Sequence, residues 1–225
     1  MNRCRLVLMV DVARLALVAE AERLKGWEAC LRAGDIASAV FYASSLEEAQ
    51  FQALAGPLVS TAQKSGVAAL IHDNSRIAGR LGADGLQLGA DPTDLKAAMD
   101  SLHPTKMVGA SGVKTRHNAL VLGELQPDYV MFGKPGGDTH DEANPKNLEL
   151  GRWWSAMIEI PCIVLAGGNP QSVIDVARCG AEFVAVDHAV FGSQSDGIDL
   201  AEAAGTVDTI NRLLDEHAPQ FEEPQ

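Results

Sequence analysis

The strongest constraint on the fold of this chain is a junction that recurs along it. In each copy a helical stretch ends, an acidic residue follows, and a short apolar strand runs to a glycine or a polar residue. The copies are 82–89, 127–133 and 180–187. Strands that alternate with helical segments of this length are typical of parallel βαβ units. Eight such strands are expected, near residues 5–10, 36–42, 67–71, 84–88, 106–110, 128–132, 161–166 and 182–187.

These units predict a single-domain (β/α)8 TIM barrel. A chain of 225 residues is short for this fold but lies within its range. We expect the barrel to cover residues 1–217 and residues 218–225 to form a disordered tail, because the last few residues are of low complexity. In such a barrel the functional groups lie where strands end and helices begin, so these junctions are the places to search for a site.

The composition excludes several classes of function. Hydrophobic residues make up 47% of the chain, yet no segment approaches the length that spans a membrane. A formal net charge of -12 argues against nucleic acid and anionic membrane surfaces as partners. The four cysteines have no Cys-x-x-Cys spacing, so neither a disulfide framework nor a zinc site is expected. We expect a cytoplasmic globular protein, and a homo-oligomer remains open.

A glycine pair after the seventh expected strand carries the clearest sign of a ligand. The segment 165–170 reads Leu-Ala-Gly-Gly-Asn-Pro, and Gly167 and Gly168 allow a ligand to approach the backbone closely. Asn169 can cap a helix, and Pro170 suits its first turn. Free N–H groups and the positive end of the helix dipole then favour a phosphate, although a tight turn without a ligand explains the local sequence equally well.

Two aspartates follow neighbouring strands in the middle of the chain. Asp73 ends the third expected strand, and Asp91 follows the fourth. Because adjacent strand ends share one rim of a parallel barrel, the two carboxylates can hold one Mg²⁺. Helix capping is the competing explanation. Asp91 before Pro92 is a good helix start, and Asp73 or Asn74 can cap the helix from residue 75.

Further short motifs occur between residues 67 and 193. They are His72-Asp73, the segment 83–90 (Ala-Asp-Gly-Leu-Gln-Leu-Gly-Ala), Gly109-Ala110-Ser111, Asp128-Tyr129-Val130, Ala166-Gly167-Gly168 and Val186-Asp187-His188-Ala189. In this order they resemble the motifs of thiamine phosphate synthase and its close relatives, the thiazole tautomerase-type proteins. The order of the motifs is more specific than any one of them.

The resemblance implies a reaction and a set of ligands. In this family, Mg²⁺ and cationic side chains draw pyrophosphate away from a pyrimidine methyl carbon, and the nitrogen of a thiazole phosphate attacks the resulting cation. Asp73 and Asp91 would then hold Mg²⁺. The phosphate of the thiazole would lie on Gly167, Gly168 and the turn at Asp187-His188, so the expected partner is a small phosphorylated heterocycle.

The chain departs from the family where pyrophosphate is held. Family synthases carry Gln-x-Arg-x-Lys on strand two, whereas 36–44 contains no basic residue. The family's Thr-x-Thr-Lys loop after strand six is replaced by 133–141, which reads Gly-Lys-Pro-Gly-Gly-Asp-Thr-His-Asp. Each lost charged hydrogen bond removes roughly 1.5 to 3 kcal/mol, so these changes predict a weakened pyrophosphate site.

Other residues are candidate substitutes, and each has an ordinary explanation beside the functional one. Lys134 follows strand six and can supply the missing cation, or it can be a solvated loop lysine. His72 stands in place of the family's Asn and can carry a proton, or it can be a hydrogen-bonded structural histidine. Together with Ser111 these are the expected catalytic residues. Lys114 and Thr139 are the expected substrate contacts.

Three functions therefore stay open from the sequence. The first is a thiamine phosphate synthase-like transferase with a rearranged pyrophosphate site. The second is a thiazole tautomerase-like isomerase, with His72 or His117 as the base. The third is a non-catalytic protein that binds a phosphate ligand. The missing basic residues of strand two favour the second and third functions, whereas the carboxylates at both strand ends favour the first.

Overall fold

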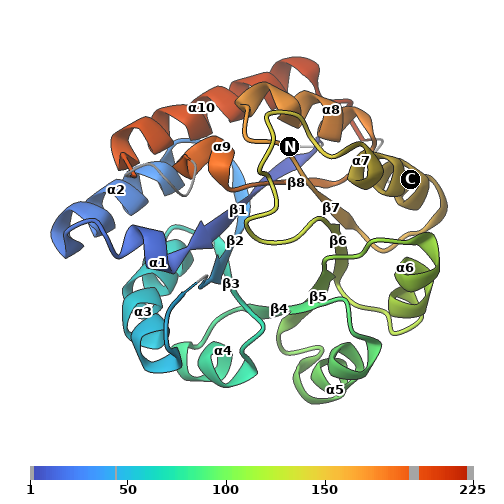
Figure 1. The fold of residues 1–225 in the computed structure, drawn as a ribbon, viewed down its shortest axis with the longest axis horizontal. Helices are drawn as coiled ribbons and strands as arrows, with labels where there is room; N and C mark the ends of the chain where they lie inside the picture. Colours follow the sequence, from blue (N-terminus) through green and yellow to red (C-terminus); the bar gives the residue numbers. More distant parts are fainter. Residues whose placement is uncertain (1–2, 44, 193–197, 222–225) are drawn as a thin grey trace.

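The strands close into a barrel, and the helices surround it. In this computed structural model residues 3–43, 45–192 and 198–221 are described. Within them each strand pairs in parallel with the next in sequence, and β8 pairs with β1 (Figure 1). The predicted (β/α)8 barrel is confirmed. Its strands are β1 (Arg5–Asp11), β2 (Ile36–Tyr42), β3 (Ala68–His72), β4 (Gly85–Gly89), β5 (Met107–Ser111), β6 (Tyr129–Phe132), β7 (Cys162–Leu165) and β8 (Phe183–Val186).

Several helices begin after a residue whose side chain accepts from a free backbone N–H group. Asn74, rather than Asp73, caps the helix after β3 by accepting from the N–H of Ile77 at 2.9 Å. The helices are α1 (Val12–Leu15), α2 (Glu20–Arg32), α3 (Glu48–Lys64), α4 (Ser75–Leu81), α5 (Pro92–Leu102), α6 (Arg116–Gly123), α7 (Pro145–Met157), the 3-10 helix η1 (Pro170–Ser172), α8 (Val173–Arg178), α9 (His188–Phe191) and α10 (Leu200–His217).

The strands are buried on both faces, and the core therefore has two layers. Along β1, Leu6 and Leu8 pack toward the helices, whereas Val7 and Met9 fill the interior of the barrel. This alternation follows from the two-residue period of a strand. Because side chains fill the interior, the barrel is a packed core and not a channel, and ligands are restricted to its rims.

The acidic residues of the repeated junctions hold neighbouring strands together. Asp84 accepts a hydrogen bond from the N–H of Ala69 at 2.8 Å, and Asp128 accepts one from Val108 at 2.7 Å. Glu182 bonds in the same way to the first residue of β7, at 2.9 Å. Each acid precedes its own strand and bonds to the start of the strand before it. The repeated acid is thus a structural feature of the amino-terminal rim, the rim that barrels use for stability.

The two ends of the described chain meet. Arg3 forms an isolated antiparallel bridge with Gln220, and Phe221 packs against the core. The described part of the expected tail, 218–221, therefore lies against the barrel, and its remainder, 222–225, is outside the described residues. Among the helices of the described ranges, none is both long and apolar enough to cross a membrane.

Candidate functional site

The carboxyl ends of the strands form the mouth of the barrel, and the loop between β6 and α7 crosses it. In Figure 1 this loop, drawn in yellow, passes in front of the strand ends before it reaches α7. It spans residues 133–144, and it turns at Gly136, whose φ of 63° suits glycine. Three of the cavities in the described structure border on this β6–α7 loop, which therefore separates the regions where a ligand can bind.

The glycine turn after β7 has the local structure that its sequence predicts. Asn169 accepts a hydrogen bond from the N–H of Gln171 at 3.0 Å, and Pro170 is the first residue of η1, which continues into α8. Within the turn, the N–H of Gly167 donates to Oγ of Ser172 at 2.9 Å. Capping and the position of proline thus agree with the sequence, whereas one of the expected ligand donors is used by the turn itself.

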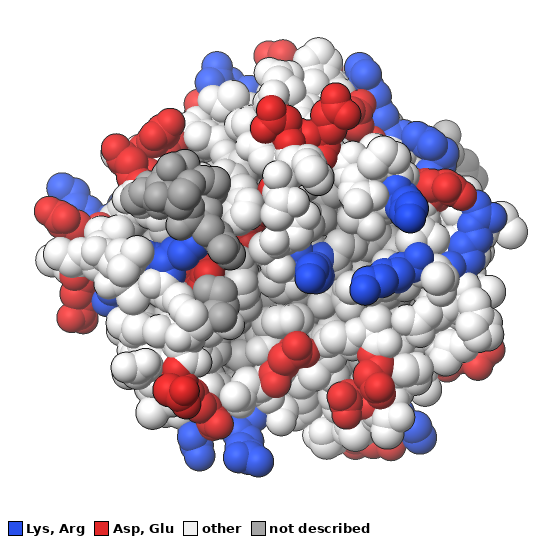
Figure 2. Space-filling model, viewed as in Figure 1, with Lys and Arg blue, Asp and Glu red and all other residues white. Residues whose placement is uncertain are grey.

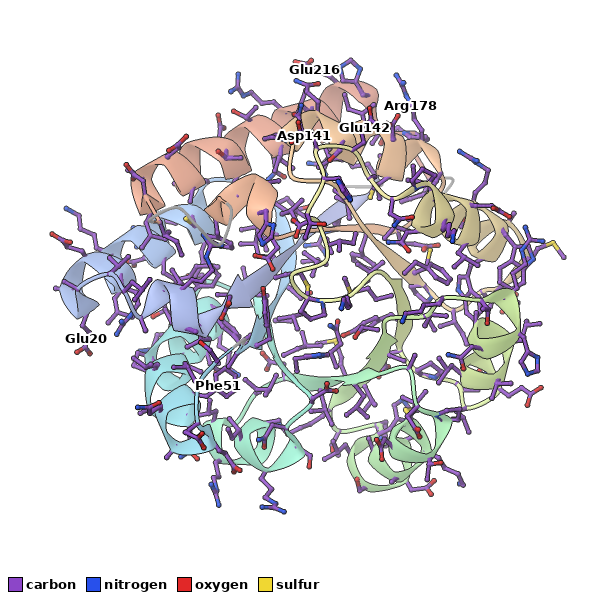
Figure 3. All side chains as sticks on the ribbon, in the orientation of Figure 1. Glu20, Phe51, Asp141, Glu142, Arg178 and Glu216 are labelled. Carbon is purple, nitrogen blue, oxygen red and sulfur yellow. The ribbon has the colours of Figure 1, made fainter. Side chains whose placement is uncertain are left out.

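The next N–H groups of the turn are bonded to the β6–α7 loop. Gly168 donates to the carbonyl of His140 at 2.7 Å, and Asn169 donates to the carbonyl of Asp141 at 3.1 Å. The fit is close, because a Cβ added to Gly167 would lie 2.2 Å from the carbonyl oxygen of Asp141. Figure 3 labels Asp141 where the loop passes beside α8. The N–H groups that the sequence leaves free for a phosphate are therefore occupied in this conformation.

The turn after β8 is occupied by a carboxylate of the same loop. Oδ2 of Asp138 accepts hydrogen bonds from the N–H groups of Asp187, at 3.2 Å, and His188, at 2.7 Å. The ring of His188 donates through Nδ1 to the carbonyl of Asp138 at 3.1 Å. Asp138 is only 4% exposed, and its Oδ1 has no hydrogen-bond partner within the described residues. A side chain of the protein thus stands where a ligand anion was expected.

The side chain of Asp187 joins three elements across the mouth. Its Oδ2 accepts from the hydroxyl of Tyr42, on β2, at 2.5 Å, and from the N–H of Gly136, in the β6–α7 loop, at 3.2 Å. Burial, and next the charge of Asp138, raise the pKa of Asp187 to about 7. This carboxyl group therefore exchanges its proton near neutral pH, far above the range of an exposed aspartate.

The β3 end holds His72 and Asp73 in one fixed arrangement. Nδ1 of His72 donates to the carbonyl of Gln87 at 3.0 Å, and Nε2 lies 3.1 Å from Oδ2 of Asp73. Burial lowers the pKa of His72, and the neighbouring Asp73 opposes that shift. Asp73 has a positive φ of 52°, and its Oδ1 accepts from the N–H of Gly89 on β4 at 2.8 Å. Because Nδ1 is the donor to the Gln87 carbonyl, Nε2 donates to Asp73 only when the ring is protonated.

Asp91 caps α5, and it is exposed. Its Oδ1 accepts from the N–H groups of Thr93 and Asp94 at 2.8 and 3.2 Å, and these bonds, that of Asp94 first, lower its pKa. The described residues contain no group of three or more His, Cys, Asp or Glu side chains suited to a metal. Two carboxylates on neighbouring strand ends still suit Mg²⁺, because this ion takes most of its ligands from water and substrate phosphates.

Three lysines surround one cavity on the other side of the β6–α7 loop. This cavity has a volume of about 320 Å³, and Lys114, Lys134 and Lys146 line it. Within the described residues their ammonium groups have neither a hydrogen-bond nor an ion-pair partner. Figure 2 shows positive side chains near the centre and to the right of this face, surrounded mostly by uncharged residues. In a protein of net charge -12 this is a local positive region.

Lys134 also lines a second cavity, at the ends of β2 and β3. This cavity has a volume of about 560 Å³, and Tyr42, His72 and Asp73 are among its other lining residues. Lys134 is exposed and stands between the two cavities. It is therefore a basic residue beside the end of β2, the strand that carries none in its described part.

The remaining expected site residues lie apart from these groups. Ser111, at the end of β5, is 2% exposed, and its hydroxyl donates to the carbonyl of Leu88 at 3.1 Å. Thr139 is exposed on the β6–α7 loop, and His117 is exposed in the first turn of α6. The structure thus brings His72, Asp73 and Lys134 together, and it brings Asp187 and His188 against the loop.

Asp138 is the main site residue that sequence reasoning missed. In the segment 136–141 it is one of two aspartates, and the sequence does not distinguish it from Asp141. The available signal was the preceding pair Gly136-Gly137, which allows the loop to fold back over the strand ends. Tyr42, considered from sequence as a stacking or core residue, donates its hydroxyl proton to Asp187.

Comparisons with known proteins show the family of this chain. The profile of the thiamine monophosphate synthase family matches residues 9–190. A thiamine-phosphate synthase of Hyphomonas neptunium is 32% identical over 196 residues, which cover 85% of this chain and 86% of that protein. One of Erythrobacter litoralis is 34% identical over 165 residues, covering 70% of this chain and 76% of that protein.

Solved structures support the fold. Thiamine phosphate pyrophosphorylase of Pyrococcus furiosus superposes with a TM-score of 0.73 at 19% identity, covering 96% of this chain and 97% of that chain. Tryptophan synthase of Mycobacterium tuberculosis superposes with a TM-score of 0.68 at 14% identity, covering 95% and 93%. At these identities the likeness shows the barrel alone, whereas the family match extends over most of the chain. The chain belongs to the thiamine monophosphate synthase family.

Proposed function

We propose that this protein joins a thiazole phosphate to a pyrimidine pyrophosphate in thiamine biosynthesis. In this reaction the bond between the pyrimidine methylene carbon and a pyrophosphate oxygen breaks, and the leaving group takes the electron pair. The thiazole nitrogen then donates its electron pair to that carbon. The protein has to stabilise the departing pyrophosphate and to anchor the thiazole phosphate.

Lys134 is the observation that carries the proposal. The described part of β2 ends in Tyr42 and has no basic residue, so it offers no cation to pyrophosphate. Lys134 lines the cavity at this strand end together with Asp73, and its ammonium group has no partner within the described residues. A charged hydrogen bond from this lysine to the leaving group strengthens as negative charge develops there. We assign this role to Lys134, with Lys114 as a second basic contact.

The carboxylates on the β3 and β4 ends suit the metal that the family implies. Asp73 and Asp91 would hold Mg²⁺, which would neutralise charge on the leaving pyrophosphate. His72 has a supporting role, since its Nε2 lies 3.1 Å from Oδ2 of Asp73 and orients that carboxylate. We assign Ser111 a structural role at the mouth, because its hydroxyl links the end of β5 to the carbonyl of Leu88 on β4.

The thiazole phosphate is assigned to the N–H groups of Gly168 and of the Asp187-His188 turn, with Gly167 allowing the close approach. Thr139, exposed beside Asp138, is its proposed side-chain contact. This assignment requires the β6–α7 loop to move, because loop oxygens now accept these hydrogen bonds.

The geometry favours this transferase over a thiazole tautomerase-like isomerase. A tautomerase needs a base with a free nitrogen at the ligand. Nδ1 of His72 bonds to the Gln87 carbonyl and its Nε2 faces the carboxylate of Asp73, and His117 lines none of the three cavities beside the loop. If the protein forms no thiamine phosphate and releases no pyrophosphate, it is a non-catalytic binding protein.

We also propose the partner and the cellular location of the protein. Its partner is a small phosphorylated heterocycle, with no role for nucleic acid or membranes. The four cysteines are all free, which supports a cytoplasmic location, where thiols stay reduced. A homo-oligomer remains a prediction that size-exclusion chromatography with light scattering tests.

A conversion assay tests the proposed reaction. The purified protein is given hydroxyethylthiazole phosphate, hydroxymethylpyrimidine pyrophosphate and Mg²⁺, and released pyrophosphate and thiamine phosphate are measured. We expect equal amounts of both, at a rate below about one per second because strand two lacks its basic residues. Binding of the thiazole phosphate without pyrophosphate release would reject the transferase and support the binding protein.

A further inference from the structure

We propose that Asp138 is an internal occupant of the phosphate cradle, which a phosphate ester has to displace in order to bind. The cradle is defined here as the N–H groups of Gly168, Asn169, Asp187 and His188. The inference rests on the proposed function, because it concerns the thiazole phosphate end of the same site.

The loop presents oxygen atoms to the cradle as a phosphate would. Oδ2 of Asp138 accepts from two of the N–H groups, at 2.7 and 3.2 Å. The carbonyls of His140 and Asp141 accept from the other two, at 2.7 and 3.1 Å. The oxygens come from one loop, and one of them belongs to a carboxylate. Backbone N–H groups at the start of helices bind anions in this way, so the loop fills the cradle with an anion of its own.

The occupant is buried at a cost. Asp138 is 4% exposed, and the carboxyl group of Asp187 lies beside it. Within the described residues Oδ1 of Asp138 accepts no hydrogen bond, and it lies 3.6 Å from Nδ1 of His188. A buried carboxylate with an oxygen that accepts no hydrogen bond is held weakly compared with one whose oxygens are all bonded. This contact is therefore one that a better anion can replace.

A cavity next to Asp138 provides space into which the β6–α7 loop can move. A cavity of about 250 Å³ lies beside the loop, and Asp138, His140 and Glu142 are among its lining residues. Leu165 and Ala166, which lead into the glycine turn, line the same cavity, so it separates part of the loop from the end of β7. Next to it the loop packs tightly on the turn, where Gly167 has no room for a Cβ.

Competition by Asp138 sets how tightly the cradle binds phosphate. A phosphate ester carries nearly two negative charges and three acceptor oxygens, so it can replace all the loop oxygens at once. An unphosphorylated thiazole alcohol supplies neither the charge nor the oxygens, and it leaves the loop in place. A phosphate binds the cradle with its intrinsic affinity multiplied by the fraction of molecules in which the loop is open.

Calorimetry on matched variants tests this inference. Inorganic phosphate and hydroxyethylthiazole phosphate are titrated separately into the wild-type protein, Asp138→Ala, Asp138→Asn and Asp141→Ala. We expect Asp138→Ala to bind both at least about tenfold more tightly, because the internal competitor is gone. Asp138→Asn should lie between, because a neutral amide oxygen accepts weaker hydrogen bonds than a carboxylate. Asp141→Ala removes an equal charge from the same loop but keeps the carbonyl that accepts from Asn169, so its gain in phosphate affinity should be smaller than that of Asp138→Asn.

Unchanged or weaker phosphate binding by the Asp138 variants would overturn the inference. Asp138→Asn keeps the shape of the side chain, so it tests the idea even if Asp138→Ala folds poorly. Tighter phosphate binding without any thiamine phosphate formation would support the occupied cradle and reject the proposed function. Thiamine phosphate formation by the wild type, with no gain of affinity in the variants, would reject the inference alone.

Discussion

The two halves of the barrel mouth differ in whether their polar groups are buried and bonded to the protein or exposed. At the β7 and β8 ends, backbone N–H groups and carboxyl groups are covered by the β6–α7 loop and bonded to it. At the β3 and β4 ends, Asp73 and Asp91 are exposed, and Lys134 stands beside a cavity with no partner among the described residues. One half is closed by the protein, and the other is open to a ligand.

The pKa values of Asp187 and Asp91 shift in opposite directions in the two halves. Asp187 is buried, and its pKa is raised to about 7, mainly by the loss of water. Asp91 is exposed and accepts two backbone hydrogen bonds, which lower its pKa. The same residue type at a strand end is thus a proton-exchanging group in the closed half and a permanent carboxylate in the open half.

The largest expected effect concerns Asp187 and the stability of the closed half. Its pKa is raised in the folded protein, so below pH 4 both states hold the proton and it contributes no difference. As pH rises toward 7, the unfolded state loses the proton first, and the free energy of unfolding falls. Asp187→Asn cannot lose a proton, so above pH 7 it should be more stable than the wild type by about 4 kcal/mol.

Urea unfolding of both proteins at pH 4 and pH 8 measures this difference. Asp141→Asn, a change of an exposed aspartate on the covering loop, is the control for the loss of one charge. A constant difference between wild type and Asp187→Asn across this range would show that the pKa of Asp187 is the same in the folded and unfolded states.

The next effect concerns the cation of the open half. Lys134→Gln should lower kcat/KM for pyrophosphate release by about ten- to a hundredfold, because one charged hydrogen bond to the leaving group is lost. Lys25→Gln, on the exposed side of α2, is the matched control. Equal rates for the two variants would assign the role to another basic residue, and Lys114→Gln would then be measured.

The glycine turn provides a sharper test of the closed half. Gly168→Asp places a carboxylate beside the cradle, where the nearest atoms to its Cβ include the carbonyl oxygens of Asp138 and His140, at 3.5 and 3.7 Å. Binding of thiazole phosphate should fall at least about tenfold through charge repulsion. Gly79→Asp, on the surface of α4, is the control. Unchanged affinity in a Gly168→Asp protein that melts cooperatively would move the phosphate site elsewhere.

The smallest effect separates capping from metal binding in the open half. Asp91→Asn should change stability by less than about 0.5 kcal/mol, since asparagine caps as well as aspartate, whereas Asp91→Ala should lose about 1 kcal/mol. Mg²⁺-dependent substrate binding should weaken in both variants, because a neutral amide is a poor ligand for this ion. Thermal melts measure the change in stability, and Mg²⁺ titrations measure the change in substrate binding. If the Mg²⁺ dependence is unaltered in both variants, Asp91 only caps α5.

Much of this protein was readable from local patterns. The eight strands, the cap at Asp91 and the start of η1 at Pro170 follow from the two-residue period of strands and from short-range hydrogen bonds. Each depends on residues a few positions apart, so the sequence contains all the information. The absence of basic residues along β2 is equally visible in the sequence, and so is Lys134, after β6, as a candidate replacement.

Only the tertiary structure decided which polar groups meet. The bond from Asp138 to the Asp187-His188 turn joins residues about fifty positions apart, and that from Tyr42 to Asp187 spans 145 positions. Such contacts depend on closure of the barrel and on the path of one loop over it. Burial, which raises the pKa of Asp187 and determines whether an N–H group is free, is a property of all the packed elements together. The sequence alone therefore determined the barrel and its turns, whereas the packed loop decided that the N–H groups after β7 and β8 are bonded within the protein.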